Sequence, residues 1–229
     1  MRLGTPILIV NLKAYREAMG EKAVSLAKAA AEVSEEEGIP VVVCPQPTDI
    51  LRIAQAVDIP IFAQHVDDVE PGKFTGHVLM EAVKEAGAMG TLVNHSERKL
   101  PLFQIDRVIR RARGLGMMSC VCADNPSTSA AVASLGPDYV AFEDPRLIGT
   151  GISVSTAEPK AVKESVERIL NANPRVIPLC GAGITKGLDA YHAVELGAKG
   201  VLVASGIVKA PDPKRAMTEI ALGLRRATR

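Results

Sequence analysis

Short apolar runs recur along this chain, and a longer amphipathic stretch follows each of them. The runs are uninterrupted rather than alternating, which is typical of parallel strands that are covered on both faces. The eight runs span residues 7–10, 39–44, 59–64, 90–94, 119–123, 139–142, 176–180 and 200–204. The stretches between them predict helices over residues 20–37, 48–57, 79–86, 102–115, 127–135, 158–170, 186–195 and 213–226.

Strand-and-helix units that alternate without a break predict a parallel sheet with crossover helices, in the α/β class. Eight such units can close into a (βα)₈ barrel, and a doubly wound open sheet is the alternative. No Gly-x-Gly-x-x-Gly fingerprint follows the first strand, which disfavours the open sheet. Because no linker or shift in composition divides the chain, we expect residues 1–229 to form a single (βα)₈ barrel domain of eight parallel strands with outer helices.

Composition narrows the class of protein. Apolar residues make up 47% of the chain and aromatic residues only 3%, so the core must consist mostly of Val, Ile, Leu and Ala. A net charge of +1 indicates neither a nucleic-acid nor an acidic-membrane partner. No apolar run is long enough to span a bilayer, and the N-terminus does not resemble a secretory signal.

The four cysteines form no Cys-x-x-Cys pair, which argues against a zinc-ribbon or redox site. Cys120 and Cys122 are two residues apart in an apolar run, so we expect them to share one face of a strand. All four cysteines are best interpreted as reduced, buried residues of a cytoplasmic protein.

Polar side chains follow several of the predicted strands, at the end where (βα)₈ barrels place their active sites. Asn11 and Lys13 follow the first strand, His95 and Glu97 follow the fourth, and Glu143 follows the sixth. Each has an ordinary explanation by itself, such as a solvated lysine or a structural histidine. Their convergence on one mouth of the barrel instead predicts acid–base chemistry.

Glycines surround the same mouth. Gly181 and Gly183 follow the seventh strand, and Gly206 follows the eighth. A phosphate needs convergent N–H donors at close range, and a Cβ would obstruct that approach. Gly149 and Gly151 lie in a loop after Glu143 and could close over the site as a mobile lid. A small phosphorylated substrate is therefore expected.

Taken together, these features resemble the triosephosphate isomerase family, particularly its shorter archaeal form, along essentially the whole chain. The pieces that carry the resemblance are Asn11-Leu12-Lys13, Asn94-His95-Ser96-Glu97, Glu143 with Ile148-Gly149-Thr150-Gly151, Cys180-Gly181-Ala182-Gly183 and Ala204-Ser205. The resemblance implies interconversion of dihydroxyacetone phosphate and glyceraldehyde 3-phosphate, a step of glycolysis and gluconeogenesis. It implies no metal and no cofactor.

The resemblance also implies roles for individual residues. Glu143 would be the base that moves a proton between neighbouring carbons, and Lys13 would stabilise the enediolate. His95 would be a neutral electrophile, as in triosephosphate isomerases, where a helix N-terminus keeps the imidazole uncharged. Glu97 would support the catalytic residues. The substrate-binding positions implied are Asn11, Lys13, Ile148, Gly149, Gly183, Ala204 and Ser205.

Two further segments bear on the resemblance. The family usually has proline directly after the base, whereas this chain has Asp144 there and Pro145 next. We expect the side chain of Asp144 to face solvent, because neighbouring residues of an extended chain point in opposite directions. The polar loop of residues 67–76 resembles the interdigitating dimer loop of the family, which implies a homodimer or a homotetramer.

Two alternative functions come from other classes. Another phosphate-binding barrel enzyme, of the aldolase or lyase type, is one alternative. A Schiff-base aldolase would need a lysine inside the barrel, but residues 119–123 and 139–142 contain none. A barrel that only binds its partner is the other alternative, and such a barrel should have lost one of Lys13, His95 or Glu143.

Overall fold

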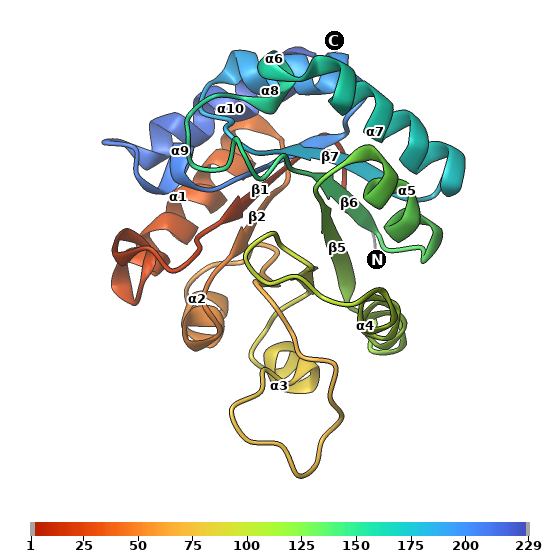
Figure 1. Ribbon diagram of the computed structural model, residues 1–229. Helices are drawn as coiled ribbons and strands as arrows, with labels where there is room; N and C mark the ends of the chain where they lie inside the picture. Colours follow the sequence, from red (N-terminus) through yellow and green to blue (C-terminus); the bar gives the residue numbers. More distant parts are fainter. Residues whose placement is uncertain (1–2, 228–229) are drawn as a thin grey trace.

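Parallel strands form the centre of the computed structural model, which describes residues 3–227 (Figure 1). Each of the eight predicted runs contains a strand. The strands are β1 (Ile7–Asn11), β2 (Val41–Cys44), β3 (Phe62–Ala63), β4 (Gly90–Val93), β5 (Met118–Ala123), β6 (Tyr139–Phe142), β7 (Ile177–Gly181) and β8 (Gly200–Val203). All their pairings are parallel, as the uninterrupted apolar runs predicted.

The strands follow the order β2-β1-β8-β7-β6-β5-β4-β3, so the first strand lies between the second and the last. β2 and β3 meet through a parallel bridge between Val43 and Ile61, and Val43 N–H donates to the Pro60 carbonyl at 3.1 Å. This contact completes the ring and confirms the predicted (βα)₈ barrel over the open sheet. The third strand is shorter than the predicted 59–64, because Pro60 has no N–H to contribute to a sheet.

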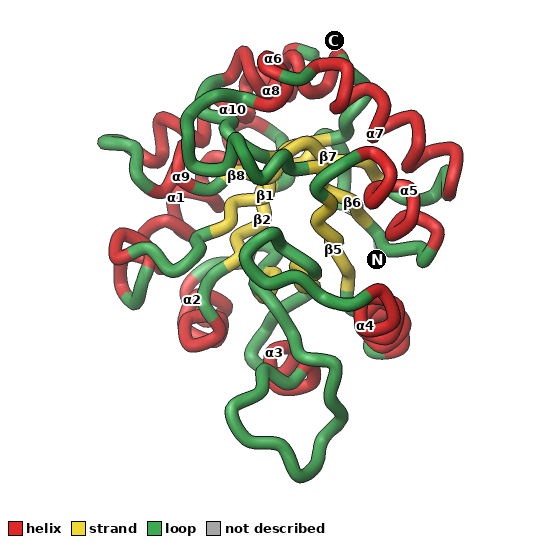
Figure 2. Tube along the Cα trace, viewed as in Figure 1, coloured by secondary structure: helices red, strands yellow, loops and turns green. Residues whose placement is uncertain are grey.

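Helices surround the strands, as the tube in Figure 2 shows. The main helices are α1 (Glu21–Glu37), α2 (Ile50–Ala56), α3 (Met80–Glu85), α4 (Leu102–Gly114), α5 (Pro126–Ser134), α7 (Pro159–Ala172), α8 (Gly187–Glu195) and α10 (Pro213–Arg226). Three short elements were not predicted: η1 (Arg16–Ala18), α6 (Val154–Ala157) and α9 (Ser205–Val208). The helix predicted over residues 48–57 is divided into a 3₁₀ turn, η2 (Pro47–Asp49), and α2. Across residues 3–227, none of the helices has the length and apolar character that crossing a bilayer requires.

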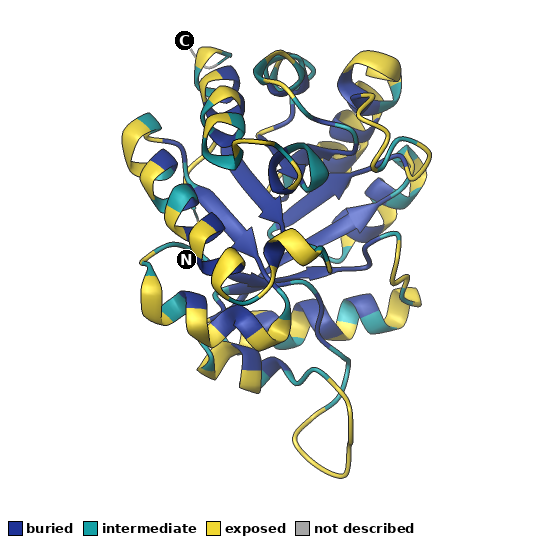
Figure 3. Ribbon diagram, turned by 90° about the vertical axis from the view of Figure 1, so that its left-hand side faces the viewer, coloured by how far each residue is buried: buried dark blue, intermediate teal, exposed yellow. Residues whose placement is uncertain are grey.

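Side chains alternate between two apolar clusters, one inside the ring of strands and one between strands and helices. In β5, Cys120 and Cys122 belong to the inner cluster while Val121 belongs to the outer one, which confirms that the two cysteines share a face. Phe62 and Tyr139 fill part of the interior, with ring centroids 6.4 Å apart. Apart from the partly buried Ile177, the strand residues are buried, while the helices expose their outer faces (Figure 3).

All four cysteines are free and buried, in agreement with the sequence interpretation. Burial raises the pKa of each thiol above its ordinary value, so none is a ready thiolate.

Candidate active site

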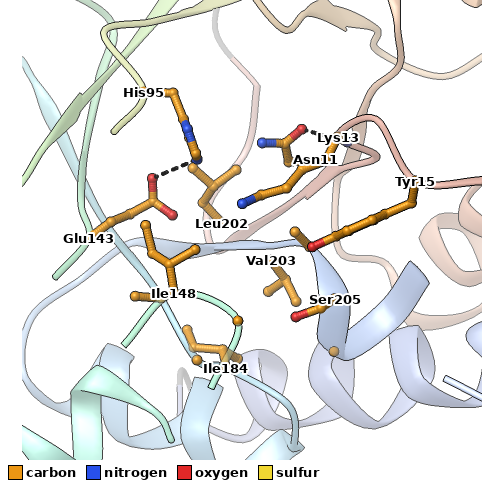
Figure 4. A pocket seen from close by; sticks show the side chains of 15 residues that line it. Asn11, Lys13, Tyr15, His95, Glu143, Ile148, Ile184, Leu202, Val203 and Ser205 are labelled. Atoms are coloured by element: carbon orange, nitrogen blue, oxygen red, sulfur yellow. Dashed lines mark hydrogen bonds and ion pairs between the residues drawn. The ribbon is translucent and has the colours of Figure 1, made fainter. Parts of the chain in front are cut away.

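One cavity opens at the C-terminal ends of the strands, and most of the predicted site residues line it (Figure 4). It contains about 410 Å³ of atom-free space, its open mouth included, which suits a small substrate. The predicted residues that line it are Asn11, Lys13, His95, Glu143, Ile148, Gly149, Gly183, Ala204 and Ser205. Glu97 is the predicted site residue outside this lining.

Lys13 follows β1 in a left-handed backbone conformation, with φ of 48°. Two contacts support this unusual geometry for a non-glycine residue. The Lys13 N–H donates to Asn11 Oδ1 at 3.0 Å, and Gln64 Nε2 donates to the Lys13 carbonyl at 2.9 Å. Gln64 also donates to the Cys44 carbonyl at 2.9 Å, so one amide ties the ends of β1 and β2 together. The Lys13 side chain points into the cavity (Figure 4).

His95 follows β4 through Asn94, which also has a positive φ, of 60°. The Asn94 side chain donates to the Cys122 carbonyl at 3.0 Å and accepts from the Leu100 N–H at 2.9 Å. The Glu97 N–H donates to His95 Nδ1 at 3.3 Å. Because a backbone N–H can only donate, Nδ1 must be the unprotonated nitrogen, and Nε2 carries the proton that faces the cavity.

No helix follows β4 directly. Residues 96–98 form a turn, closed by the Arg98 N–H donating to the His95 carbonyl at 2.7 Å. The tautomer of His95 is therefore set in this chain by one backbone N–H of that turn rather than by a helix terminus.

Glu143 is the buried carboxylate of the cavity, with only 6% of its surface exposed. Among the described residues, nothing hydrogen-bonds its Oε2, which lies 3.7 Å from His95 Nε2. That separation is too long for a hydrogen bond, so the oxygen remains able to accept a proton. Gly181 of β7 makes room for the carboxylate, because a Cβ there would lie 2.5 Å from Glu143 Cγ.

Glu97 lies beside Lys13 and His95 without lining the cavity, and its side chain is 68% exposed. Its Oε2 is 3.5 Å from Lys13 Nζ and 3.5 Å from His95 Nδ1. The contact with Lys13 pairs opposite charges. The one with His95 is longer than the backbone N–H contact and does not change the inferred tautomer.

Residues with small side chains or none line the part of the cavity that follows β7 and β8. Ala182 and Gly183 have positive φ, of 72° and 68°, and Ala204 to Gly206 lie at the start of α9. The first N–H groups of any helix lack intrahelical acceptors and are available to an anion. This side of the cavity therefore has the character of a phosphate site.

The loop of residues 144–153, which we call the lid, covers the cavity from one side. Ile148 and Gly149 contribute to the lining, and Gly149 has a φ of 77°. A Cβ on Gly183 would lie 1.8 Å from the Ile152 carbonyl oxygen, so the far end of the lid packs directly on the glycine turn.

The prediction that the Asp144 side chain faces solvent is wrong. The residue is only 7% exposed, and its carboxylate accepts bonds from Arg146 rather than facing solvent. The chain turns here, with the Leu147 N–H donating to the Asp144 carbonyl at 3.0 Å, so the alternation of an extended chain does not apply. The hydrogen bond from Arg146 lowers the pKa of Asp144 below its ordinary value.

Several lining residues were not predicted from the sequence. They are Tyr15, Ile184, Leu202 and Val203, whereas Ala182 and Gly206 belong to the turns named above. Leu202 could have been found, because it belongs to the inner cluster near the C-terminal end of β8. No local sequence pattern marks Tyr15 or Gln64 as a site residue, because their roles depend on which strands become neighbours.

Comparisons with known proteins agree on one family. The family model described as triosephosphate isomerase matches residues 6–221. A triosephosphate isomerase of Methanobacterium bryantii is 53% identical over 94% of this chain and 96% of its own length. One from Methanosarcina barkeri is 50% identical over 95% and 98%.

A crystal structure of triosephosphate isomerase from Bartonella henselae shares the fold, with a TM-score of 0.76 at 15% identity, and covers 96% of this chain and 99% of its own. At that identity the structural similarity shows the fold alone. With the match of the family model and the identity to the methanogen proteins, it is clear that this chain belongs to the triosephosphate isomerase family.

Proposed function

We propose that the cavity interconverts dihydroxyacetone phosphate and glyceraldehyde 3-phosphate, as expected of an isomerase of this family. The observation that carries the proposal is the unpaired Oε2 of Glu143, 3.7 Å from His95 Nε2, in the same cavity as Lys13. This arrangement holds a base and a hydrogen-bond donor on two sides of one small space. The reaction belongs to glycolysis and gluconeogenesis.

Glu143 begins the reaction by accepting a proton from the carbon next to the substrate carbonyl. The electron pair of that C–H bond forms a C=C bond, and the carbonyl oxygen becomes negative. The His95 Nε2–H and the Lys13 ammonium stabilise this oxygen. Only 6% of the surface of Glu143 is exposed, so little water competes with these interactions and they are stronger than in solvent.

His95 then moves protons between the two oxygens of the enediolate. Its Nε2–H protonates the first oxygen, and the same nitrogen takes the proton of the neighbouring hydroxyl. Glu143 returns its proton to the adjacent carbon, which completes the isomerisation without any net change in the enzyme. The N–H groups near Gly183 and Ser205 would hold the phosphate, and Asn11 would keep Lys13 in place.

A coupled assay with glyceraldehyde 3-phosphate tests the function, with the reaction run in deuterated water to detect proton exchange at carbon. We expect turnover with solvent label in the product, lost in Glu143→Gln. An active Glu143→Gln variant would contradict the assignment of the base. Cleavage of a carbon–carbon bond would favour the aldolase alternative, although no described strand residue is a lysine.

The chain is further proposed to assemble into a homodimer or a homotetramer through the loop of residues 67–76. This loop projects away from the barrel (Figures 1 and 3), and Phe74 near its tip is 53% exposed. Its base is rigid: Asp67 accepts from the Val78 N–H at 2.6 Å and from Arg98 at 2.9 Å. A partner subunit at this loop would also explain why Glu97 lies exposed beside the cavity.

Light scattering after size exclusion tests the assembly. Deleting several residues between Asp68 and Lys73 should yield monomers with poor activity, because the proposed loop insertion would be lost. A fully active monomer would reject the insertion. We also propose a cytoplasmic location, which four free, buried cysteines support because they suit a reducing compartment. A single domain over residues 1–229 is proposed as well, and the one eight-stranded sheet supports it.

A further inference from the structure

Arg146 connects the first residue of the lid with a residue just beyond its far end. Its guanidinium donates to both carboxylate oxygens of Asp144, at 3.0 Å from Nε to Oδ1 and 2.6 Å from Nη2 to Oδ2. Its own N–H donates to Asp144 Oδ1 at 2.9 Å. The same Nη2 lies 3.6 Å from an oxygen of Glu158, which separates α6 from α7. One side chain thus contacts both the first residue of the lid and the residue that follows α6.

Asp144 needs this partner more than an ordinary surface carboxylate does. It is 7% exposed, whereas the Arg146 side chain is 76% exposed, so the cation covers the acid from outside. A buried carboxylate without a partner is costly, and Arg146 is the cation that the structure places against it. The planar fork of arginine also fixes the direction of the carboxylate, which a lysine would not do.

The position of Asp144 beside the base connects this ion pair to catalysis. Asp144 directly follows Glu143, so any rotation of its backbone is transmitted to the base. Pro145 biases Asp144 toward extended backbone but leaves its own φ free. The hydrogen bonds that the Asp144 carboxylate accepts from Arg146 therefore restrict this hinge.

We propose that Arg146 is a positioning residue for the isomerase reaction, which acts through Asp144 to keep the lid closed over the enediolate. This inference rests on the proposed function. Arg146 does not line the cavity, so it touches neither the substrate nor the reacting atoms. Its contribution comes from holding the hinge in the closed arrangement.

An opened lid has a chemical consequence that can be measured. In a free enediolate whose charge is on the oxygen of the terminal carbon, that oxygen reforms a carbonyl, the C=C bond shifts to join the central carbon and the carbon that bears the phosphate, and the C–O bond to phosphate breaks. Inorganic phosphate leaves with the bonding electrons, and the remaining enol tautomerises to methylglyoxal. A closed site suppresses such side reactions. Phosphate released per isomerisation therefore reports lid closure independently of overall stability.

The experiment compares the wild-type chain with Arg146→Gln, Arg146→Lys, Asp144→Ala and the double variant Asp144→Ala/Arg146→Gln. We expect Arg146→Gln to raise phosphate release per isomerisation by about two- to fivefold. This factor corresponds to the usual free-energy contribution of an exposed ion pair. The KM should stay near the wild-type value. Arg146→Lys should restore part of the effect, because it keeps the charge but not the fork. In the Asp144→Ala background, Arg146→Gln should add nothing.

Arg168→Gln is the matched control, because Arg168 is another partly exposed arginine paired with a glutamate, at 2.8 Å from Glu164 within α7. It should leave phosphate release unchanged. Equal phosphate release in Arg146→Gln and wild type overturns the inference, and so does an equal change in both Asp144 backgrounds. A wild-type chain without isomerase activity instead overturns the proposed function, and this inference with it.

Discussion

His95 Nε2 and Glu143 Oε2 face each other at 3.7 Å across the mouth of the barrel, with no hydrogen bond between them. The two atoms come from the ends of β4 and β6, which are not adjacent in the sheet. The Glu97 N–H donates to His95 and orients its ring, and the absence of a side chain at Gly181 leaves room for Glu143. The pair is therefore pre-organised before a substrate arrives, and the supporting groups can be tested as well as the pair itself.

Shortening the base should separate catalysis from binding. Glu143→Asp withdraws the carboxylate by one methylene group, and a misplacement of about 1 Å typically costs about 100-fold in rate. We expect kcat to fall by about that factor or more, while the KM changes little, because the carboxylate acts mainly in the transition state. Steady-state kinetics with both triose phosphates would measure this. Near-normal turnover would remove Glu143 from the mechanism.

The hydrogen bond to His95 Nδ1 predicts a tautomer that spectroscopy can read. In protein labelled with ¹⁵N-histidine at neutral pH, the Nδ1 of His95 should give the resonance of an unprotonated nitrogen, and Nε2 that of an N–H. His95→Gln identifies the signals by their disappearance. A proton found on Nδ1 would show that the Glu97 N–H does not donate to it, and the neutral donor facing the substrate would have to be abandoned.

Gly181→Ala should damage the site although it is remote from the substrate carbonyl. Its new Cβ would lie 2.5 Å from Glu143 Cγ and 2.8 Å from Oε1, closer than packed atoms normally approach. The carboxylate must move, so we expect a drop in kcat of about tenfold or more. Since φ at Gly181 is not positive, the backbone itself accepts alanine.

The matched control for that variant is Gly114→Ala, at the end of α4. Nothing lies within 4 Å of a Cβ built there, and its φ is not positive either. This change should leave kcat unaltered and raise the free energy of unfolding by up to about 1 kcal/mol, because alanine is the better helix former. Similar losses of activity in both variants would point to a general effect of the added methyl rather than to displacement of the base.

Gln64→Ala tests the support of Lys13. It removes the donor shared by the carbonyls of Lys13 and Cys44. The Cys44 carbonyl keeps the Leu12 N–H as a donor, but the Lys13 carbonyl loses the hydrogen bond from Gln64, and an unpaired buried acceptor costs about 1–3 kcal/mol. Affinity for a phosphorylated hydroxamate that mimics the enediolate should fall, because the left-handed backbone of Lys13 loses one of the two hydrogen bonds that support it. Calorimetric titration would measure it, with the exposed Gln55→Ala as control. Unchanged affinity would mean that Asn11 alone positions Lys13.

Much of this protein is encoded locally. The uninterrupted apolar runs predicted every strand, because a strand covered on both faces has no polar side to alternate with. Residues at the strand ends could be named as site candidates for the same reason, since parallel strands bring their C-terminal ends to one edge. Lys13, His95 and Glu143 accordingly share one cavity.

Tertiary structure decided what depends on contacts between distant residues. The predicted strand 59–64 shrank to Phe62–Ala63, because only closure of the barrel determines which N–H groups find a partner. Asp144 is buried instead of facing solvent, because the chain turns there and is not extended, and Arg146 pairs with its carboxylate from outside. Gln64 and Gly181 matter only through the strands that closure sets beside them. The periodicity of the sequence predicts the secondary structure of each segment, but which atoms come into contact depends on how the barrel closes.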